Sequence, residues 1–298
     1  MNTYKTNIDF LSKTKIGILF SSVLITFGLI SLLINKGPNL SIDFTGGTVI
    51  RMEFNSNIKI DEIRSLLSTT SLNNAEITEI FEIGNSNKEF RIKTNMSEDI
   101  GELNKKLLEL LKDFNPEIRK IENVGPKIGG ELTMQAIYAI CLALIMLMIY
   151  IGFRFDRFYA FGSVLAIIHD VLFTLSIFSI LQLEIDLSIV AAFLTIVGYS
   201  LNDTIVIFDR FRENSKKDLD LELNDLANLS LNQTLSRTII TSLTTLVVVI
   251  ILYYIGGEVI KYFAFALIVG VLVGTYSSIF VASPFMLYLK SKYKIEEE

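Results

Sequence analysis

The sequence predicts a polytopic α-helical membrane protein: six transmembrane helices, with a small α+β domain of ferredoxin-like β-α-β-β-α-β order between the first two. Three observations predict this fold class. Hydrophobic residues make up 51% of the 298 residues and mean hydropathy is +0.49, although 20% of the residues are charged. Six apolar runs are long enough to cross a hydrocarbon core of ~30 Å. A single polar stretch, residues 35–131, holds 13 basic and 16 acidic residues, about half of the charged residues in the chain.

Each apolar run has close to the ~20 residues that a membrane-spanning helix needs. The first run follows Lys13 and Lys15, as a signal peptide would. It is longer than a usual signal core, and Asn35–Pro38 follow it instead of a small-residue cleavage site. We therefore expect a retained anchor, and Pro284 is expected to end the last run. The expected spans are residues 16–34, 132–153, 159–181, 187–208, 233–255 and 263–283.

The distribution of Lys and Arg in the short loops predicts the orientation. With the N-terminus inside, the inside segments hold 13 basic residues, whereas the short outside loops hold only Lys261. The sequence therefore predicts that the termini, residues 1–15 and 284–298, are cytoplasmic and that residues 35–131 lie on the outer side. Residues 209–232 are expected to form a solvated cytoplasmic loop.

The outer stretch alternates between strand and helix patterns. Ile50, Met52 and Phe54 repeat at every second position, which is typical of a half-buried strand, and apolar residues in 60–67 and 100–114 repeat at helical spacing. The other expected strands are residues 75–83, 90–93 and 117–124, with a turn at residues 84–87. This order predicts two helices on one face of an antiparallel sheet.

Composition argues against several functions. The net charge of −5 provides no basic field for nucleic acid. The single cysteine, Cys141, excludes an intramolecular disulfide and a cysteine-based zinc site, and we expect neither a metal nor a cofactor. Residues 35–131 contain no histidine or cysteine, and the chain contains no H-E-x-x-H or G-x-S-x-G motif. The outer domain is thus expected to bind or to move, not to catalyse, with a plain solvated spacer as the alternative.

Few ionisable residues fall inside the expected spans, and such residues often mark ion paths. Asp203 lies near the cytoplasmic end of the fourth span, and Arg237 lies at a similar depth at the start of the fifth. The two could form an ion pair across the bundle, with hydrogen bonds from Asn202 and Thr204. His169 and Asp170 lie near the middle of the third span and are candidates for a second station of a proton relay.

Two interpretations of Asp203 and Arg237 remain open at this point. A static ion pair could lock two helices, or Arg237 could extend its charge to the head groups without any role. Alternatively, the carboxyl group of Asp203 could act as a proton switch, releasing Arg237 and changing helix packing when it takes up a proton. For His169, packing in the bundle is as reasonable as proton relay.

Three motifs in this order resemble the SecF family of bacterial protein-export membrane subunits. They are Ile42–Thr48 after the first span, Val124–Pro126 with Gly129 before the second, and Gly198–Asn214 at the end of the fourth. The Arg237-Thr238 and His169-Asp170 pairs fit as well. The motif residues that this resemblance singles out are Asp43, Phe44, Thr45, Gly46, Gly47, Gly125, Pro126, Gly198, Asp209 and Arg210.

The resemblance implies a function in the bacterial cytoplasmic (inner) membrane. Family members act with SecD and use the proton-motive force to promote late steps of polypeptide export, with Asp203 in the position of the proton-carrying acid and Arg237 as its counter-charge. The implied partners are SecD, the channel SecYEG, the motor SecA, the translocating polypeptide and the lipid bilayer, with YajC and YidC as further candidates. The alternatives are a proton-driven small-molecule exporter of the resistance-nodulation-division type and a structural scaffold of a membrane complex.

Overall fold

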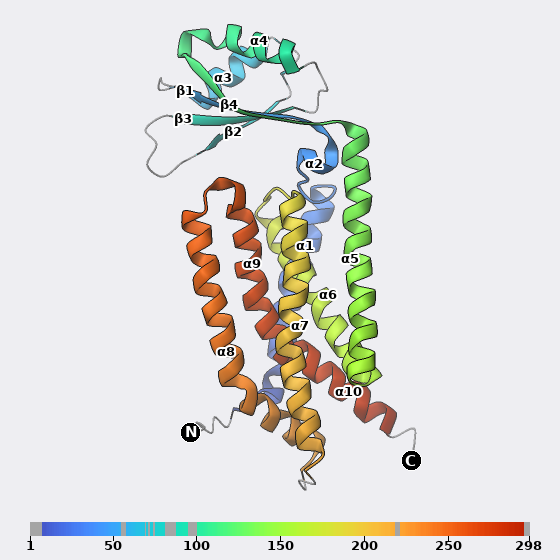
Figure 1. The fold of residues 1–298 in the computed structure, drawn as a ribbon. Helices are drawn as coiled ribbons and strands as arrows, with labels where there is room; N and C mark the ends of the chain where they lie inside the picture. The colour runs from blue at the N-terminus through green and yellow to red at the C-terminus, as the bar shows by residue number, and fades with distance from the viewer. Residues whose placement is uncertain are drawn as a thin grey trace. The chain divides into compact units, whose positions relative to one another are not determined.

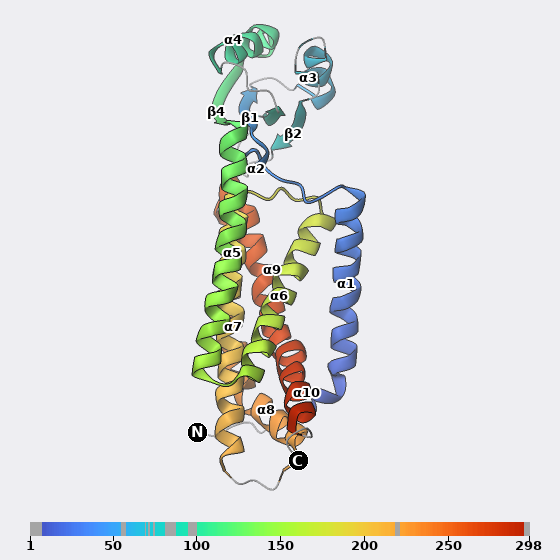
Figure 2. The same cartoon turned by 90° about the vertical axis from the view of Figure 1, so that its right-hand side faces the viewer.

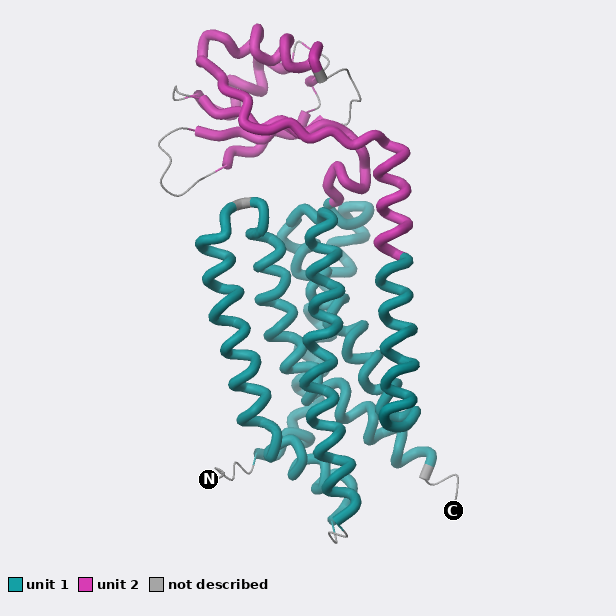
Figure 3. Tube along the Cα trace, viewed as in Figure 1, with its two compact units in different colours: residues 1–39, 138–298 teal, residues 40–137 magenta. Residues whose placement is uncertain are grey.

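The computed structural model describes residues 8–54, 58–68, 70, 72–73, 75–80, 88–94, 100–217 and 221–294. The chain forms two compact units. A helical unit combines residues 1–39 with residues 138–298, and a smaller unit consists of residues 40–137 (Figure 3). The turn expected at residues 84–87 lies outside the described residues.

Within the described part of the chain, six apolar helical segments are long enough to cross a membrane. Segments α6, α7 and α9 with its continuation bury 50% of their most apolar stretch inside the unit, whereas α1, α5 and α8 expose most of their apolar side chains. Figure 2 shows α1 at one edge of this unit, alongside α6. The helices are α1 (Thr14–Ile34), α5 (Pro126–Arg154), α6 (Arg157–Ile180), α7 (Leu187–Ser215), α8 (Leu223–Ile255), α9 (Glu258–Ser277) and α10 (Ser283–Lys294).

Helices α7 and α8 extend well beyond the expected spans. Residues 209–232, expected as a solvated loop, are helical as far as Ser215 and again from Leu223. Polar side chains join the two helix ends: Asn214 Nδ2 donates to Ser230 Oγ at 3.0 Å and to Gln233 Oε1 at 2.9 Å. Hydropathy detects only the apolar part of such a helix, so the sequence placed the end of α7 too early and the start of α8 too late.

Pro284 does not end the last helix, and the end of the membrane span at residue 283 stays a prediction. The helix continues from Glu258 to Lys294, through a π-helical turn at Ser278–Ala282. In this turn the N–H of Ser283 donates to the carbonyl of Ser278, and Ser283 Oγ donates to the same oxygen at 2.8 Å. Proline lacks an N–H and crowds the preceding turn of a regular helix, so the wider turn lets the chain continue past it.

The smaller unit has the expected element order. Strands β1 (Gly47–Phe54), β2 (Glu76–Ile80), β3 (Lys88–Thr94) and β4 (Pro116–Val124) form an antiparallel sheet in the order β2-β3-β1-β4. Helices α3 (Ile60–Leu67) and α4 (Ile100–Leu110) lie on one face of this sheet (Figure 1). The ferredoxin-like prediction is confirmed.

The core of this unit lies between the sheet and the two helices. The expected inward residues of β1, Ile50, Met52 and Phe54, are all buried there, with Phe90 and Ile92 of β3 beside them. Helices α3 and α4 contribute Ile63, Leu67, Leu103 and Leu107. On the opposite face, Glu53 is only 4% exposed and accepts a hydrogen bond from Nε of Arg119 on β4 at 2.6 Å. This carboxylate holds the pKa of Arg119 above its ordinary value.

Candidate functional site

The buried face of α7 carries Asp203 into the interior of the helical unit. Ile196, Ser200, Asp203 and Ile207 follow one another at helical spacing, and each is buried. The Oδ2 atom of Asp203 lies 3.5 Å from Ser242 Oγ on α8 and 3.5 Å from Thr275 Oγ1 on α9. These two hydroxyls are 2.6 Å apart and hydrogen-bond to each other. Three helices therefore meet at one carboxyl group, which is held only by long hydrogen bonds.

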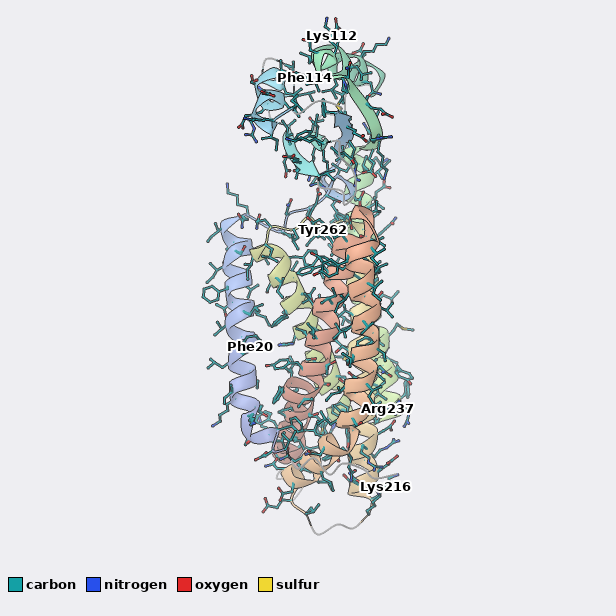
Figure 4. The ribbon with its side chains drawn as sticks, turned by 90° about the vertical axis from the view of Figure 1, so that its left-hand side faces the viewer. Phe20, Lys112, Phe114, Lys216, Arg237 and Tyr262 are labelled. Carbon is teal, nitrogen blue, oxygen red and sulfur yellow. The ribbon has the colours of Figure 1, made fainter. Side chains whose placement is uncertain are left out.

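Arg237 does not form the expected ion pair with Asp203. Its side chain is exposed, and no ion pair joins the two residues in the part of the chain that the structure describes. Figure 4 shows Arg237 on α8, nearer to Lys216 at one end of the unit than to Tyr262 at the other. The buried face of α8 carries Thr238 and Ser242. Arg237 precedes Thr238 and so lies about 100° around the helix from that face.

The two residues expected to support Asp203 do not contact its carboxyl group. Asn202 is exposed and takes part in no hydrogen bond among the described residues. Thr204 is buried, but its Oγ1 donates to the backbone carbonyl of Ser200 at 3.3 Å. Asn202 and Thr204 each lie about 100° around the helix from Asp203, so their side chains start in other directions than its carboxyl group.

Asp170 lies at the centre of a second, tighter cluster. It is 1% exposed, and its Oδ2 accepts hydrogen bonds from Ser200 Oγ of α7 at 2.5 Å and Ser277 Oγ of α9 at 2.7 Å. Its Oδ1 lies 3.0 Å from Nδ1 of His169. His169 therefore contacts its neighbour Asp170 directly, and a hydroxyl from each of two other helices completes the cluster. A role of this cluster in proton relay stays a prediction.

The two clusters share two helices, α7 and α9. Ser200 and Asp203 are three residues apart on α7, and Thr275 and Ser277 are two apart on α9. Gly274 lets these helices approach closely, because a Cβ at this position would lie 3.0 Å from Ser200 Cβ. Gly270 lies one turn before Gly274 and also faces α7, because a Cβ there would lie 2.2 Å from Ile196 Cγ1.

Several buried polar atoms near these clusters have no hydrogen-bond partner among the described residues. They are Nε2 of His169, Oγ1 of Thr238 and the hydroxyls of Tyr199 and Tyr276. The rings of His169 and Tyr276 stack with centroids 6.2 Å apart. Buried polar groups normally find a partner in protein or water. Each of the two carboxyl groups is contacted by hydroxyls from two other helices, and His169 contacts one of the two.

Sequence reasoning missed the hydroxyl groups that surround both aspartates. Ser242, Thr275 and Ser277 gave no signal, because isolated Ser and Thr are common in membrane helices and often bond only to their own backbone. The sequence does not show which helices are in contact, so it could not show which of these side chains face Asp203. No group of His, Cys, Asp and Glu suited to a metal ion occurs among the described residues.

Comparison with known proteins identifies the family. The model of the C-terminal region of the protein export membrane proteins SecD/SecF matches residues 104–292, and that of the SecD/SecF GG motif matches residues 31–58. The chain is 42% identical to protein translocase subunit SecF of Calditerrivibrio nitroreducens, over 96% of this chain and 95% of the relative. It is 45% identical to that of Haemophilus influenzae, over 92% and 83%. The chain belongs to the SecD/SecF family.

Solved structures agree with this assignment. The crystal structure of SecDF, a translocon-associated membrane protein from Thermus thermophilus, is similar to 98% of this chain, with a TM-score of 0.88 and 37% identity. A structure of SecDF in a super-membrane-facing form covers 100% of this chain, with a TM-score of 0.73 and 36% identity. This chain spans 40% of the length of each SecDF chain. The protein is therefore a multi-pass membrane protein of a protein-export family.

The SecD/SecF GG motif has a clear structural basis in this chain. Helix α2 (Ile42–Thr45) contains Asp43 and Phe44, and Ser41 Oγ caps it by accepting the Asp43 N–H at 3.2 Å. The next residue, Gly46, has a φ of 71°, and a Cβ there would lie 2.8 Å from Pro126 Cα. A Cβ at Gly129 would lie 2.8 Å from the carbonyl oxygen of Phe44. Two motifs that the sequence showed separately thus pack against each other within the smaller unit.

The remaining family motif residues lie on α7. Asp209 accepts hydrogen bonds from Arg154 at 3.1 Å and Arg212 at 3.0 Å, and Arg210 Nε donates to Gln233 Oε1 at 2.6 Å. These contacts join α7 to α5 and α8 at one end of the helical unit. Gly198 is exposed, and its position has open space for a Cβ.

Proposed function

We propose that this protein works with a SecD-type partner to promote late steps of polypeptide export, driven by the proton-motive force. Membership of a protein-export family supports the export function. The observation that carries proton coupling is Asp203, a carboxyl group buried among apolar helices and held only by two hydroxyls at 3.5 Å. A loosely held carboxyl group can change its protonation with little disruption of fixed hydrogen bonds.

In the proposed switch, the protonated Asp203 keeps its place among Ser242 and Thr275. The ionised form attracts Arg237, which then moves from the exposed side of α8 towards the carboxylate. Because α8 and α9 both contact Asp203, this change alters how the two helices pack on α7. A membrane potential of ~100 mV supplies ~2.3 kcal/mol per charge moved fully across, enough to bias a two-state arrangement of helices.

His169 and Asp170 are proposed as a relay station that serves Asp203. Helices α7 and α9, which contribute to both clusters, and the unpartnered Nε2 of His169 support a connection between the two carboxyl groups. The tight hydrogen bonds of Asp170 suit a fixed station, in contrast to the loosely held Asp203.

The proposed location is the bacterial inner membrane, with both termini cytoplasmic and residues 35–131 on the outer side. The strong excess of Lys and Arg in the segments proposed to be inside supports this orientation. Figure 1 is consistent with it, because α1 begins and α10 ends at the same end of the helical unit. The proposed partners are SecD, SecYEG, SecA and the exported polypeptide, with YajC and YidC as further candidates.

The decisive experiment measures export into inner-membrane vesicles with and without a proton gradient. Asp203→Asn removes the titratable group and should abolish the stimulation by the gradient, while co-purification with the partner stays intact. Asn202→Ala is the matched control, since Asn202 is the exposed neighbour of Asp203, and it should export like the unmodified protein. Full stimulation in Asp203→Asn would exclude the proton switch.

Two further measurements separate the alternatives. A small-molecule exporter should transport substrate as a purified single chain, whereas the proposed export function requires a second subunit. A scaffold based on a static ion pair should tolerate replacement of Asp203 and Arg237 by apolar residues. The absence of that ion pair among the described contacts argues against the scaffold.

A further inference from the structure

A pocket of about 350 Å³ opens between α6 and α10 at the end of the helical unit where both chain termini lie. Its wall is almost entirely apolar: Phe158 and Phe161 of α6 and Phe285, Leu289 and Tyr293 of α10. The last three residues are four apart, so they form one face of α10. Arg157 is the one charged residue in the wall.

The guanidinium of Arg157 is held in place by aromatic rings. Its Cζ lies 5.0 Å from the ring centroid of Phe158 and 5.9 Å from that of Tyr293, and these two rings stack with centroids 5.6 Å apart. Arg157 forms no ion pair or hydrogen bond within the described residues. Its N–H groups are therefore available for a ligand, and a planar guanidinium matches two oxygens of a phosphate.

The charges around the pocket favour an anion. Lys292 is exposed and lies three residues after Leu289, on the same side of α10. Asp156 is the nearest acidic residue along the chain, and its Oδ1 already accepts the N–H of Phe158 at 3.0 Å. The pocket lies at the end of membrane helices and has a cation at its mouth. It therefore presents one polar and one hydrophobic surface to a single ligand.

We propose that this pocket binds an anionic phospholipid, such as phosphatidylglycerol, with its phosphate on Arg157 and an acyl chain against Phe161, Phe285 and Leu289. The aromatic and aliphatic wall distinguishes a lipid from free phosphate, which would leave that surface exposed to water. Basic residues near a membrane surface attract anionic lipids. This inference does not depend on proton coupling, so the two can fail separately.

Native mass spectrometry of the full-length protein, purified in detergent and mixed with phosphatidylglycerol or phosphatidylcholine, tests the proposal. Arg157→Gln should weaken phosphatidylglycerol binding at least threefold and leave phosphatidylcholine binding unchanged. Lys216→Gln is the matched control, because Lys216 is an exposed cation at the same end of the unit but outside the pocket, and it should bind like the unmodified protein (Figure 4).

A second variant tests the pocket without altering any charge. Leu289→Trp fills the space for the acyl chain and should also weaken phosphatidylglycerol binding, with a melting temperature close to that of the unmodified protein. Equal binding of phosphatidylglycerol by Arg157→Gln or Leu289→Trp and the unmodified protein would overturn the site. A rise in melting temperature with inorganic phosphate as large as that with phosphatidylglycerol would overturn the lipid assignment.

Discussion

At the scale of single residues, the two intramembrane aspartates differ in how firmly they are held. Asp170 accepts hydrogen bonds of 2.5 and 2.7 Å and contacts His169, whereas the two hydroxyls near Asp203 are both 3.5 Å away. Loss of an acceptor leaves its donors unsatisfied, and this costs more when the bonds are short and buried. We therefore expect Asp170 to contribute more than Asp203 to the free energy of unfolding.

Melting temperatures of the two alanine variants test this difference. Asp170→Ala should lower the free energy of unfolding by about 1–3 kcal/mol, because three donors lose their acceptor. Asp203→Ala should lower it by less than about 1 kcal/mol. Equal destabilisation, or a larger effect at Asp203, would contradict the proposed division between a fixed and a mobile carboxyl group.

Asp9 provides a residue-scale test of pH dependence outside the spans. Its Oδ1 accepts the N–H of Ser12 at 3.1 Å and Nδ2 of Asn228 at 2.8 Å, and Asn228 Oδ1 in turn accepts the N–H of Phe10. The hydrogen bond from the Ser12 N–H, followed by that from Asn228, holds the pKa of Asp9 below its ordinary value of 3.8. The carboxylate therefore stabilises this N-terminal contact above pH 3.8, and the stabilisation is lost as the pH falls through the lowered pKa.

Amide hydrogen exchange of Leu11 and Ser12 measures this effect. After correction for the intrinsic exchange rate, protection should be constant from pH 7 to about pH 5 and should decrease towards pH 3. Asp9→Asn keeps a side-chain oxygen that cannot titrate, so its protection should not change with pH. A parallel decrease in Asp9→Asn would show that another group is responsible.

At the scale of elements, glycines determine where chain segments can touch. Gly46 combines a φ of 71° with a close approach to Pro126, whereas Gly125 has open space around its Cβ position. Both belong to the family motifs, yet only Gly46 is required by the local geometry. Similarly, Gly274 lets α9 approach Ser200, whereas a Cβ at Gly198 would have no atom within 4 Å.

Substitution by alanine should separate the two glycines of the smaller unit. Gly46→Ala combines backbone strain with a clash against the Pro126 backbone and should destabilise the unit by about 2 kcal/mol or more. Gly125→Ala should change its stability by less than about 0.5 kcal/mol. Thermal unfolding followed by circular dichroism checks both values, and similar effects of the two substitutions would refute the steric argument.

At the scale of the whole molecule, two units have separate cores. The core of residues 40–137 is formed by its own sheet and helices, while the helical unit buries α6, α7 and α9 and exposes apolar side chains of α1, α5 and α8. Apolar side chains can remain exposed on membrane helices because lipid tails are as apolar as they are. The smaller unit has no such surroundings and must bury its apolar residues internally.

Residues 40–131, produced alone, should therefore fold and unfold cooperatively in water. Phe90→Ala removes a fully buried ring and should destabilise this fragment by about 3–5 kcal/mol, close to the total stability of many small domains. Glu109→Ala, at an exposed position on α4, should change it by no more than about 0.5 kcal/mol. A fragment without a cooperative melting transition would show that this unit depends on the helices.

The sequence by itself determined the fold class, the family, the six apolar helices and the strand-helix order of the smaller unit. These properties depend on local chemistry: the length of apolar runs, the alternation in residues such as Ile50 and Met52, and short motifs. It also identified Asp170 and Asp203 as exceptional, because any carboxyl group in an apolar span is unusual.

Only the tertiary structure decided which groups surround these carboxyls. Their similar depth in the expected spans suggested Arg237 as the partner of Asp203. The face of α8 that points inward instead carries Thr238 and Ser242. Ser277 joins Asp170, and the π-helical turn carries the last helix past Pro284. Helix rotation and contact between distant helices depend on how several surfaces pack together, and no single segment of sequence contains that information.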